Sequence, residues 1–164
     1  MSQFYQNSYR QAGLTTDLPS KQELQILLEQ NFSCSEKDFS LYFPLLQSIA
    51  LHLNREISVL DYGANWGYAC HQFNGLGFTS KVCGYELSRP RMIYGRENLG
   101  ISYVNDPSEV KGSFDVIFSS HCIEHMSNPS ELKKWTDLVL RDDGYVVLIC
   151  PNGSDYPRVK DPSW

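Results

Sequence analysis

The sequence predicts an α/β fold in which helices cover both faces of an open, mostly parallel sheet. From residue 57 onward, short apolar runs rich in β-branched residues alternate with stretches of helical character, which is typical of βαβ units. The first run ends in a turn with two glycines, and the next ends in a carboxylate. The 164 residues, 41% of them hydrophobic, suffice for the core of one globular domain.

Residues 1–54 are expected to form an N-terminal segment that packs on or caps a core of residues 55–164. The stretch up to about Pro19 is polar, and two interpretations stay open: a loosely ordered terminus, or a segment that folds over a ligand site. Ser20 followed by Glu23 fits a capping box, and leucines at helical spacing follow it. Pro44 suits the first turn of a second helix.

The remaining elements alternate between strand and helix. Strands are predicted over residues 57–61, 81–86, 101–104, 114–119 and 145–150. Helices are predicted over residues 68–76 and 88–100, and from residue 128 onward, where an Asn-Pro pair can begin one. Asp142, Asp143 and Gly144 are predicted to form the turn into the last strand.

Charge and cysteine content exclude several classes of function. The net charge of −5 comes without a basic stripe, so nucleic acid is not expected as a partner. The five cysteines are odd in number and contain no Cys-x-x-Cys pair, which argues against a disulfide framework and a zinc knuckle. No apolar run approaches the ~20 residues of a membrane span, and the N-terminus has no signal-peptide apolar region. We therefore expect a cytoplasmic protein with reduced thiols.

The turn after the first strand is the first candidate binding site. In an open α/β sheet, ligands bind beyond the carboxyl ends of the strands. The turn reads Asp61-Tyr62-Gly63-Ala64-Asn65-Trp66-Gly67, in which two glycines let the backbone bend sharply and a ligand approach it. Two glycines that merely make a tight turn are the alternative interpretation.

Glu86 ends the second predicted strand and should lie at the same edge of the sheet. It follows Gly67 by 19 residues, close to the ~20 at which an acid beyond a glycine turn binds the hydroxyls of a ribose. A solvated Glu that begins a helix is the alternative. Glu86 alone does not distinguish an adenosyl cofactor from a dinucleotide, because both contain a ribose.

The glycine turn does favour one cofactor. A dinucleotide site has the pattern G-x-G-x-x-G, whereas Asn65 takes the middle position here and Tyr68 replaces the third glycine. Asp61 would repel a pyrophosphate but could hold, directly or through water, the cationic methionine end of a sulfonium. The electrostatics therefore favour S-adenosylmethionine over NAD.

Four segments together resemble class I S-adenosylmethionine-dependent methyltransferases. They are VLDYGANWG, GYELSRPRM, FDVIFSSHCIEHM and LRDDGYVVLICPN, in the order and spacing of that family over residues 57–152. The resemblance implies a Rossmann-like fold whose last two strands are missing from this sequence. We favour the interpretation that the sequence is a piece of a longer chain. There are two alternatives: a partner completes the sheet, or the chain is a remnant that only binds cofactor.

The resemblance also implies roles for individual residues. The methionine end of the cofactor would contact Asp61, Gly63, Ala64 and Gly67. Glu86 would bind the ribose, Leu87 the face of the adenine, and Asp106 the adenine amino group. Ser120 and His121 occupy a position that touches cofactor and substrate in this family.

His121, Glu124 and His125 also match the spacing H-x-x-E-H of some zinc proteases. Pro129 follows so closely that a zinc-binding helix has little room, and we assign no metal site. A divalent-ion site of the kind found in some small-RNA and quinone methyltransferases is a second alternative. Hydrogen bonds from Glu124 and His125 that orient the loop are the simpler interpretation.

The predicted function is transfer of a methyl group to a hydroxyl or carbon of a small molecule, lipid or sugar. The segment after the fourth predicted strand reads SSHC and lacks the Asn/Asp-Pro-Pro-Tyr sequence of amino-group methyltransferases. His121 is the candidate base for a protonated acceptor, and a purely pocket-lining role is its alternative. A non-catalytic domain that binds cofactor or a partner protein, and an NAD-linked oxidoreductase, are the rival functions. A homodimer is also compatible with the sequence.

Overall fold

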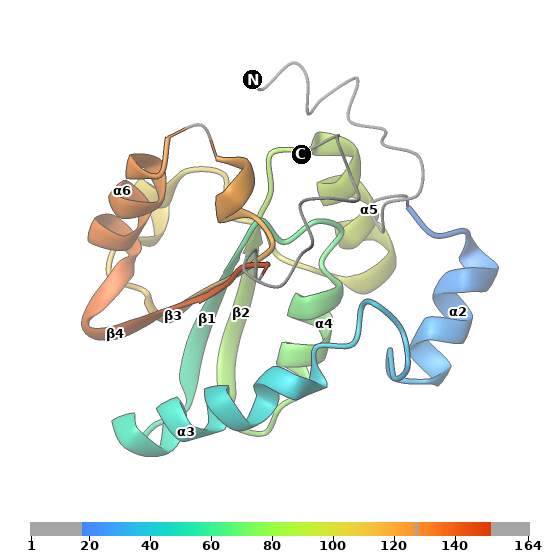
Figure 1. Cartoon of the computed structure of the whole chain (residues 1–164), viewed down its shortest axis with the longest axis horizontal. Helices are drawn as coiled ribbons and strands as arrows, with labels where there is room; N and C mark the ends of the chain where they lie inside the picture. The colour runs from blue at the N-terminus through green and yellow to red at the C-terminus, as the bar shows by residue number, and fades with distance from the viewer. Residues whose placement is uncertain (1–17, 127, 152–164) are drawn as a thin grey trace, which may run out of the picture.

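The computed structural model describes residues 18–126 and 128–151 (Figure 1). Its helices are α2 (Lys21–Glu29), α3 (Phe43–Leu53), α4 (Tyr68–Asn74), α5 (Arg89–Leu99) and α6 (Ser130–Val139), with 3-10 turns η1 (Ser40–Tyr42), η2 (Pro107–Val110) and η3 (Ile123–His125). Its strands are β1 (Ile57–Tyr62), β2 (Thr79–Tyr85), β3 (Phe114–Ser120) and β4 (Leu140–Ile149). Within the described ranges, every helix is too short or too polar to cross a bilayer.

The four strands form one parallel sheet in the order β2-β1-β3-β4, which confirms the predicted fold class. The chain passes from β1 to β2 on one side and then crosses back to β3 on the other side of β1. The strand order therefore reverses at β1, and ligands of such sheets bind in the crevice at that reversal, outside the carboxyl ends of the strands.

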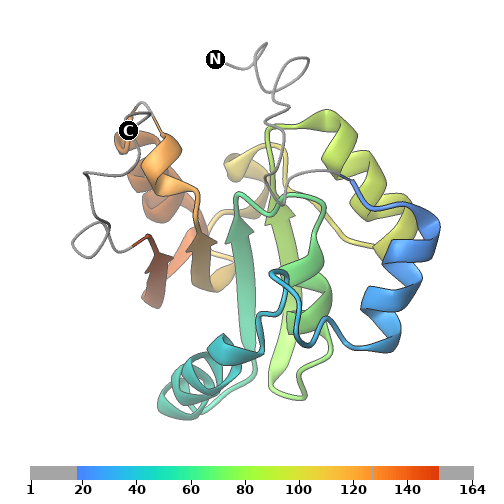
Figure 2. The same ribbon diagram turned by 45° about the vertical axis from the view of Figure 1, so that its right-hand side comes forward.

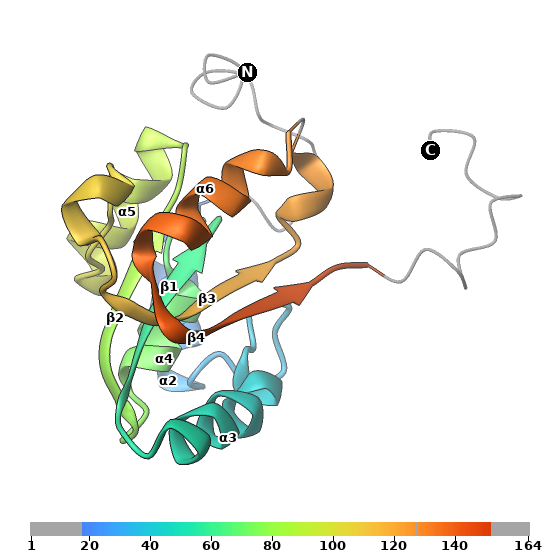
Figure 3. The ribbon, with the colours of Figure 1, turned by 90° about the vertical axis from the view of Figure 1, so that its left-hand side faces the viewer.

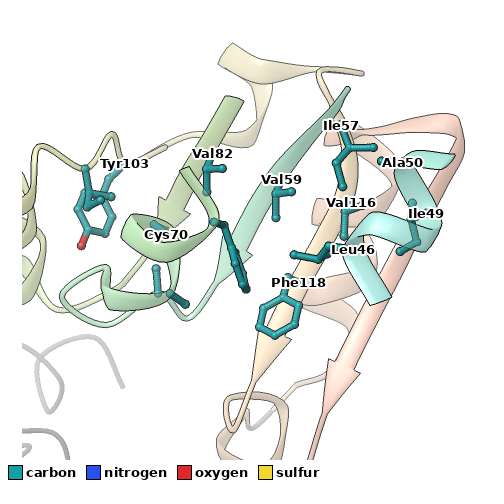
Figure 4. Close-up of a cluster of buried hydrophobic side chains, with 14 residues drawn as sticks. Leu46, Ile49, Ala50, Ile57, Val59, Cys70, Val82, Tyr103, Val116 and Phe118 are labelled. Atoms are coloured by element: carbon teal, nitrogen blue, oxygen red, sulfur yellow. The ribbon is translucent and has the colours of Figure 1, made fainter. Parts of the chain in front are cut away.

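Helices cover both faces of the sheet, as the sequence predicts (Figure 3). Strand β1 is buried along its whole length. Val59 points to the face covered by α3 and α4, and its neighbour Leu60 points to the face covered by α6. Figure 4 shows the first of these clusters, in which Leu46 of α3 lies close to Val116 and Phe118 of β3.

The N-terminal helices begin where the sequence places them. The capping box of α2 is present: the Ser20 hydroxyl accepts a hydrogen bond from the Glu23 N–H at 3.2 Å, and the Glu23 carboxylate accepts one from the Ser20 N–H at 2.7 Å. Pro44 lies in the first turn of α3, as predicted. Helix α3 packs on the sheet, whereas α2 packs beside α4 and α5 (Figure 2).

The strand predicted over residues 101–104 is wrong. Of these residues, only Tyr103 forms a β-bridge, to Gly84 of β2. The Gly84 N–H donates to the Ser102 carbonyl and the Val104 N–H donates to the Gly84 carbonyl, each at 2.8 Å. Pro107 follows at once and begins η2, so the segment leaves the sheet before a ladder can form.

The turn predicted at residues 142–144 is also wrong, because these residues lie within β4. Phe114 pairs with Leu140 and Val116 with Tyr145, so β4 bulges between the two pairs. The bulge brings Arg141 to the carboxylate of Asp115 at 2.7 Å. Long-range ion pairs have therefore overridden the local turn preference of an Asp-Asp-Gly sequence.

The Asp115 network joins strands β1, β3 and β4 at their amino ends. The Asp115 side chain is fully buried and accepts hydrogen bonds from the Arg55 and Arg141 guanidinium groups and from the N–H and hydroxyl of Ser58. Arg55 also binds Asp143 at 2.7 Å. Burial alone would raise the pKa of Asp115, but these hydrogen-bond donors lower it by a larger amount, so the pKa is about 2.

Candidate functional site

The glycine turn leaves the carboxyl end of β1 at the reversal of strand order. Gly63 and Gly67 have φ angles of 88° and 86°, in the region that residues with a Cβ avoid. The N–H groups of Gly63 and Ala64 both donate to the Tyr85 carbonyl at 2.9 Å. The turn is therefore held against the carboxyl end of β2.

Side chains from other loops fill the space beside both glycines. A Cβ on Gly63 would lie 2.5 Å from the Cys122 thiol sulfur, and a Cβ on Gly67 would lie 2.7 Å from Ile101 Cγ1. The Tyr103 hydroxyl donates to the Asn65 carbonyl at 3.1 Å. The glycines thus serve the packing of the turn as well as its backbone conformation.

Glu86 lies directly beside this turn. One carboxylate oxygen accepts a hydrogen bond from the Asn65 N–H at 2.9 Å, and the other accepts one from the Ser88 N–H at 2.7 Å. An ionised carboxylate offers about four lone-pair positions, so two are left for hydroxyl donors. The backbone donors fix the orientation of the acid before any ligand arrives.

Asp61 is the buried acid of the site, with 4% of its surface exposed. It accepts a hydrogen bond from the Cys70 thiol, a weak donor whose sulfur lies 3.6 Å from the carboxylate. Burial raises the pKa of Asp61 to about 7; the Cys70 hydrogen bond opposes this rise, and the nearby Glu86 charge adds to it. A cation bound at this carboxylate would favour its ionised form.

The carboxyl end of β3 lies at the same edge of the sheet, next to β1. Ser120 is the last residue of the strand, and His121 follows with a left-handed φ of 49°. The His121 N–H donates to the Ile149 carbonyl at 2.9 Å, and its Nδ1 lies 3.5 Å from a Glu124 carboxylate oxygen. The imidazole is 60% exposed. A left-handed, non-glycine backbone of this kind is uncommon and often occurs at functional sites.

The residues expected around an adenine are more peripheral. Leu87 is 46% exposed. Asp106 is the N-cap of η2, and its carboxylate accepts hydrogen bonds from the Ser108 N–H and hydroxyl at 2.9 and 2.8 Å. In the parts of the chain that the structure describes, no three His, Cys, Asp or Glu side chains are grouped as they would be to hold a metal ion.

Sequence reasoning missed four residues that shape the site. Ser88 orients Glu86, Cys70 is the hydrogen-bond donor to Asp61, Cys122 packs on Gly63, and Tyr103 bonds to Asn65. Ser88 had a local signal, since its N–H lies two residues beyond the acid. Cys70 lies in α4, directly after the turn, whereas Tyr103 and Cys122 approach the site from distant segments, and none of the three residue types gave a sign of these contacts.

Comparison with known proteins identifies the family. A family model described as a methyltransferase domain matches residues 35–164. The chain belongs to this methyltransferase family. A comparison with curated proteins gave no significant match.

Several solved methyltransferase structures share the fold. An S-adenosylmethionine-dependent methyltransferase from Mesorhizobium loti superposes with a TM-score of 0.52 at 24% identity, over 68% of this chain and 54% of that one. The methyltransferase CalH, solved with S-adenosylhomocysteine (SAH), superposes with a TM-score of 0.52 at 19% identity, over 64% of this chain and 34% of CalH. The plantazolicin methyltransferase BpumL, also solved with SAH, superposes with a TM-score of 0.52 at 18% identity, over 63% of this chain and 43% of BpumL. This chain thus spans between about a third and just over half of these proteins.

Proposed function

We propose that this chain binds S-adenosylmethionine and forms the cofactor-binding part of a methyltransferase. The main support is the geometry of Glu86, whose carboxylate is oriented by two backbone N–H groups beside the left-handed glycine turn. An acid in this place can accept hydrogen bonds from both hydroxyls of a ribose. Membership of the methyltransferase family and the SAH bound to CalH and BpumL support the same cofactor.

The charge of the site distinguishes this cofactor from a dinucleotide. Asp61 and Glu86 both border the turn, and the charge of Glu86 adds to the raised pKa of Asp61. Two acids oppose a pyrophosphate and favour a ligand that carries a sulfonium and an ammonium group. An NAD-linked oxidoreductase is therefore the weaker candidate.

The proposed reaction is an in-line displacement at the methyl carbon, for which the bound sulfonium supplies the leaving group. The chain then mainly has to hold the acceptor close and aligned. His121, at the end of β3, is the candidate to take a proton from a hydroxyl acceptor, and Ser120 would line the same crevice. We propose as acceptor a hydroxyl or carbon of a small molecule, lipid or sugar, since the segment Ser119–Cys122 lacks the amino-group motif.

Titration calorimetry with S-adenosylmethionine and SAH tests the cofactor, with NAD as comparison. Glu86→Ala should weaken adenosyl binding by about 100-fold, because two hydrogen bonds to a charged acceptor are lost at about 1.5 kcal/mol or more each. Glu97→Ala is the matched control, since it removes the same charge from an exposed position on α5. Glu86→Gln replaces the alanine variant should that variant not fold by circular dichroism.

Each outcome separates the rival functions. Tight binding of NAD with no adenosyl binding would overturn the proposal in favour of an oxidoreductase. Equal losses in Glu86→Ala and Glu97→Ala would show that Glu86 does not contact the ribose. Adenosyl binding without turnover on any hydroxyl or carbon acceptor would favour the non-catalytic alternative.

A further inference from the structure

Trp66, within the glycine turn, is enclosed by aromatic side chains from three different segments. Its indole is fully buried, with ring centroids of Phe32, Tyr94 and Tyr68 at 6.2, 5.8 and 4.9 Å. Its Nε1 has no hydrogen-bond partner among residues 18–126 and 128–151, although a buried N–H normally has one. The position of this indole is therefore imposed by the packing around it and not by a hydrogen bond of its own.

Phe32 comes from the segment 20–34, which lies outside the residues matched by the methyltransferase family model. Helix α2 of this segment buries Leu24 in the same cluster and packs beside α4 and α5 (Figure 2). The Tyr94 hydroxyl of α5 donates to the Pro19 carbonyl at 2.9 Å, just before the segment begins. The segment is thus attached to the core next to the candidate site.

The backbone at Phe32 is strained for an aromatic residue. Asn31, Phe32 and Cys34 have φ angles of 47°, 61° and 60°, and a left-handed conformation costs free energy in residues with a Cβ. The Phe32 N–H donates to the Leu27 carbonyl at 2.7 Å, and the Phe32 carbonyl accepts from the Ser35 hydroxyl at 2.6 Å. These bonds hold the ring of Phe32, which is fully buried, against Trp66. Strain of this kind persists only where the surroundings over-determine it.

Trp66 is linked by hydrogen bonds to the acid of the site. The backbone N–H of Trp66 donates to the Asn65 side-chain oxygen at 2.8 Å, and the backbone N–H of Asn65 donates to the Glu86 carboxylate at 2.9 Å. Asn65 is itself left-handed, with a φ of 53°. A shift of the indole would therefore displace the backbone that orients Glu86.

We propose that the segment 20–34 is a positioning element of the cofactor site, with Phe32 acting on the glycine turn through Trp66. The predicted loss of cofactor affinity rests on the proposed function, whereas the predicted change in the conformation of the turn does not. When Phe32 is removed, the turn should sample other conformations, and the affinity for the adenosyl cofactor should fall. By reciprocity, cofactor should hold the segment 20–34 in place.

Phe32→Leu, compared with Phe114→Leu, tests the proposal. Both phenylalanines are fully buried, but Phe114 lies at the amino end of β3 in the cluster on the other face of the sheet. We expect the SAH dissociation constant to rise by about tenfold or more in Phe32→Leu and to change by less than about twofold in Phe114→Leu. Both variants should lose stability, measured by urea unfolding.

Amide hydrogen exchange without ligand gives a second readout. We expect faster exchange at the Asn65, Trp66 and Gly67 amides in Phe32→Leu and unchanged exchange there in Phe114→Leu. Wild-type protein with SAH should show slower exchange within residues 20–34. Unchanged exchange at the turn in Phe32→Leu would overturn the proposal whether or not the wild type binds SAH. If exchange at the turn changes but the wild type does not bind SAH, the result counts against the proposed function alone.

Discussion

Asp61 should make cofactor binding depend on pH. Its carboxyl group is buried and has a pKa of about 7, because burial outweighs the hydrogen bond from Cys70, and only its ionised form attracts a cation. With that pKa, the ionised fraction rises from about one tenth at pH 6 to about three quarters at pH 7.5. The affinity for S-adenosylmethionine should therefore rise about eightfold over this interval, or about 1.2 kcal/mol. The upper limit avoids loss of the ligand's own amino proton, near pH ~8.

Calorimetry at the two pH values, in buffers with different ionisation enthalpies, measures both the affinity and the proton released. Asp61→Asn should bind weakly with no such pH dependence. A carboxyl with a raised pKa destabilises the unliganded fold as pH rises from about 4 through about 7, so this variant should also unfold at a higher temperature at pH 7.5. The same affinity at both pH values in the native chain, or the same slope in Asp61→Asn, would refute the reasoning.

Two further predictions concern stability. Gly67→Ala should lower the free energy of unfolding in urea by about 2–4 kcal/mol, because the added Cβ is strained in the left-handed conformation and collides with Ile101. Gly100→Ala should lower it by only about 1 kcal/mol, because Gly100 is also left-handed, with a φ of 67°, but nothing lies within 4 Å of the added Cβ. Equal losses would contradict the close packing at Gly67. Asp115 has a depressed pKa of about 2 and should contribute about 2 kcal/mol above pH ~4, lost as pH falls toward 2. Asp115→Asn should flatten the acid limb of the stability curve, and an unchanged limb would show that the network adds nothing.

Local sequence patterns were sufficient where local structure decided the outcome. The glycine turn and Glu86 could be placed together because parallel strands end at one edge of the sheet, and the sharp bend predicted at Gly63 and Gly67 appears as two left-handed residues. The capping box at Ser20 is likewise a local device, and α2 begins where it predicts.

Most of the failures come from contacts between distant segments. The Asp-Asp-Gly sequence became part of β4, where Arg141 pairs with Asp115 of the neighbouring strand β3. Residues 101–104 have the composition of a strand, yet they lie at the margin of the sheet and turn away at Pro107. Phe32 gave no signal at all, since no pattern shows that a left-handed phenylalanine will contact a tryptophan in the glycine turn.

The Asp115 network has a consequence for how this protein can change over evolutionary time. It fastens β1, β3 and β4 at their amino ends, whereas the glycine turn, Glu86 and His121 follow the carboxyl ends of strands. Under the proposed function, substitutions in the loop around His121 would alter which acceptor binds while Asp115 keeps the strands in register. A laboratory search for new acceptors would do best to randomise residues 121–126 and leave Arg55, Ser58 and Arg141 untouched.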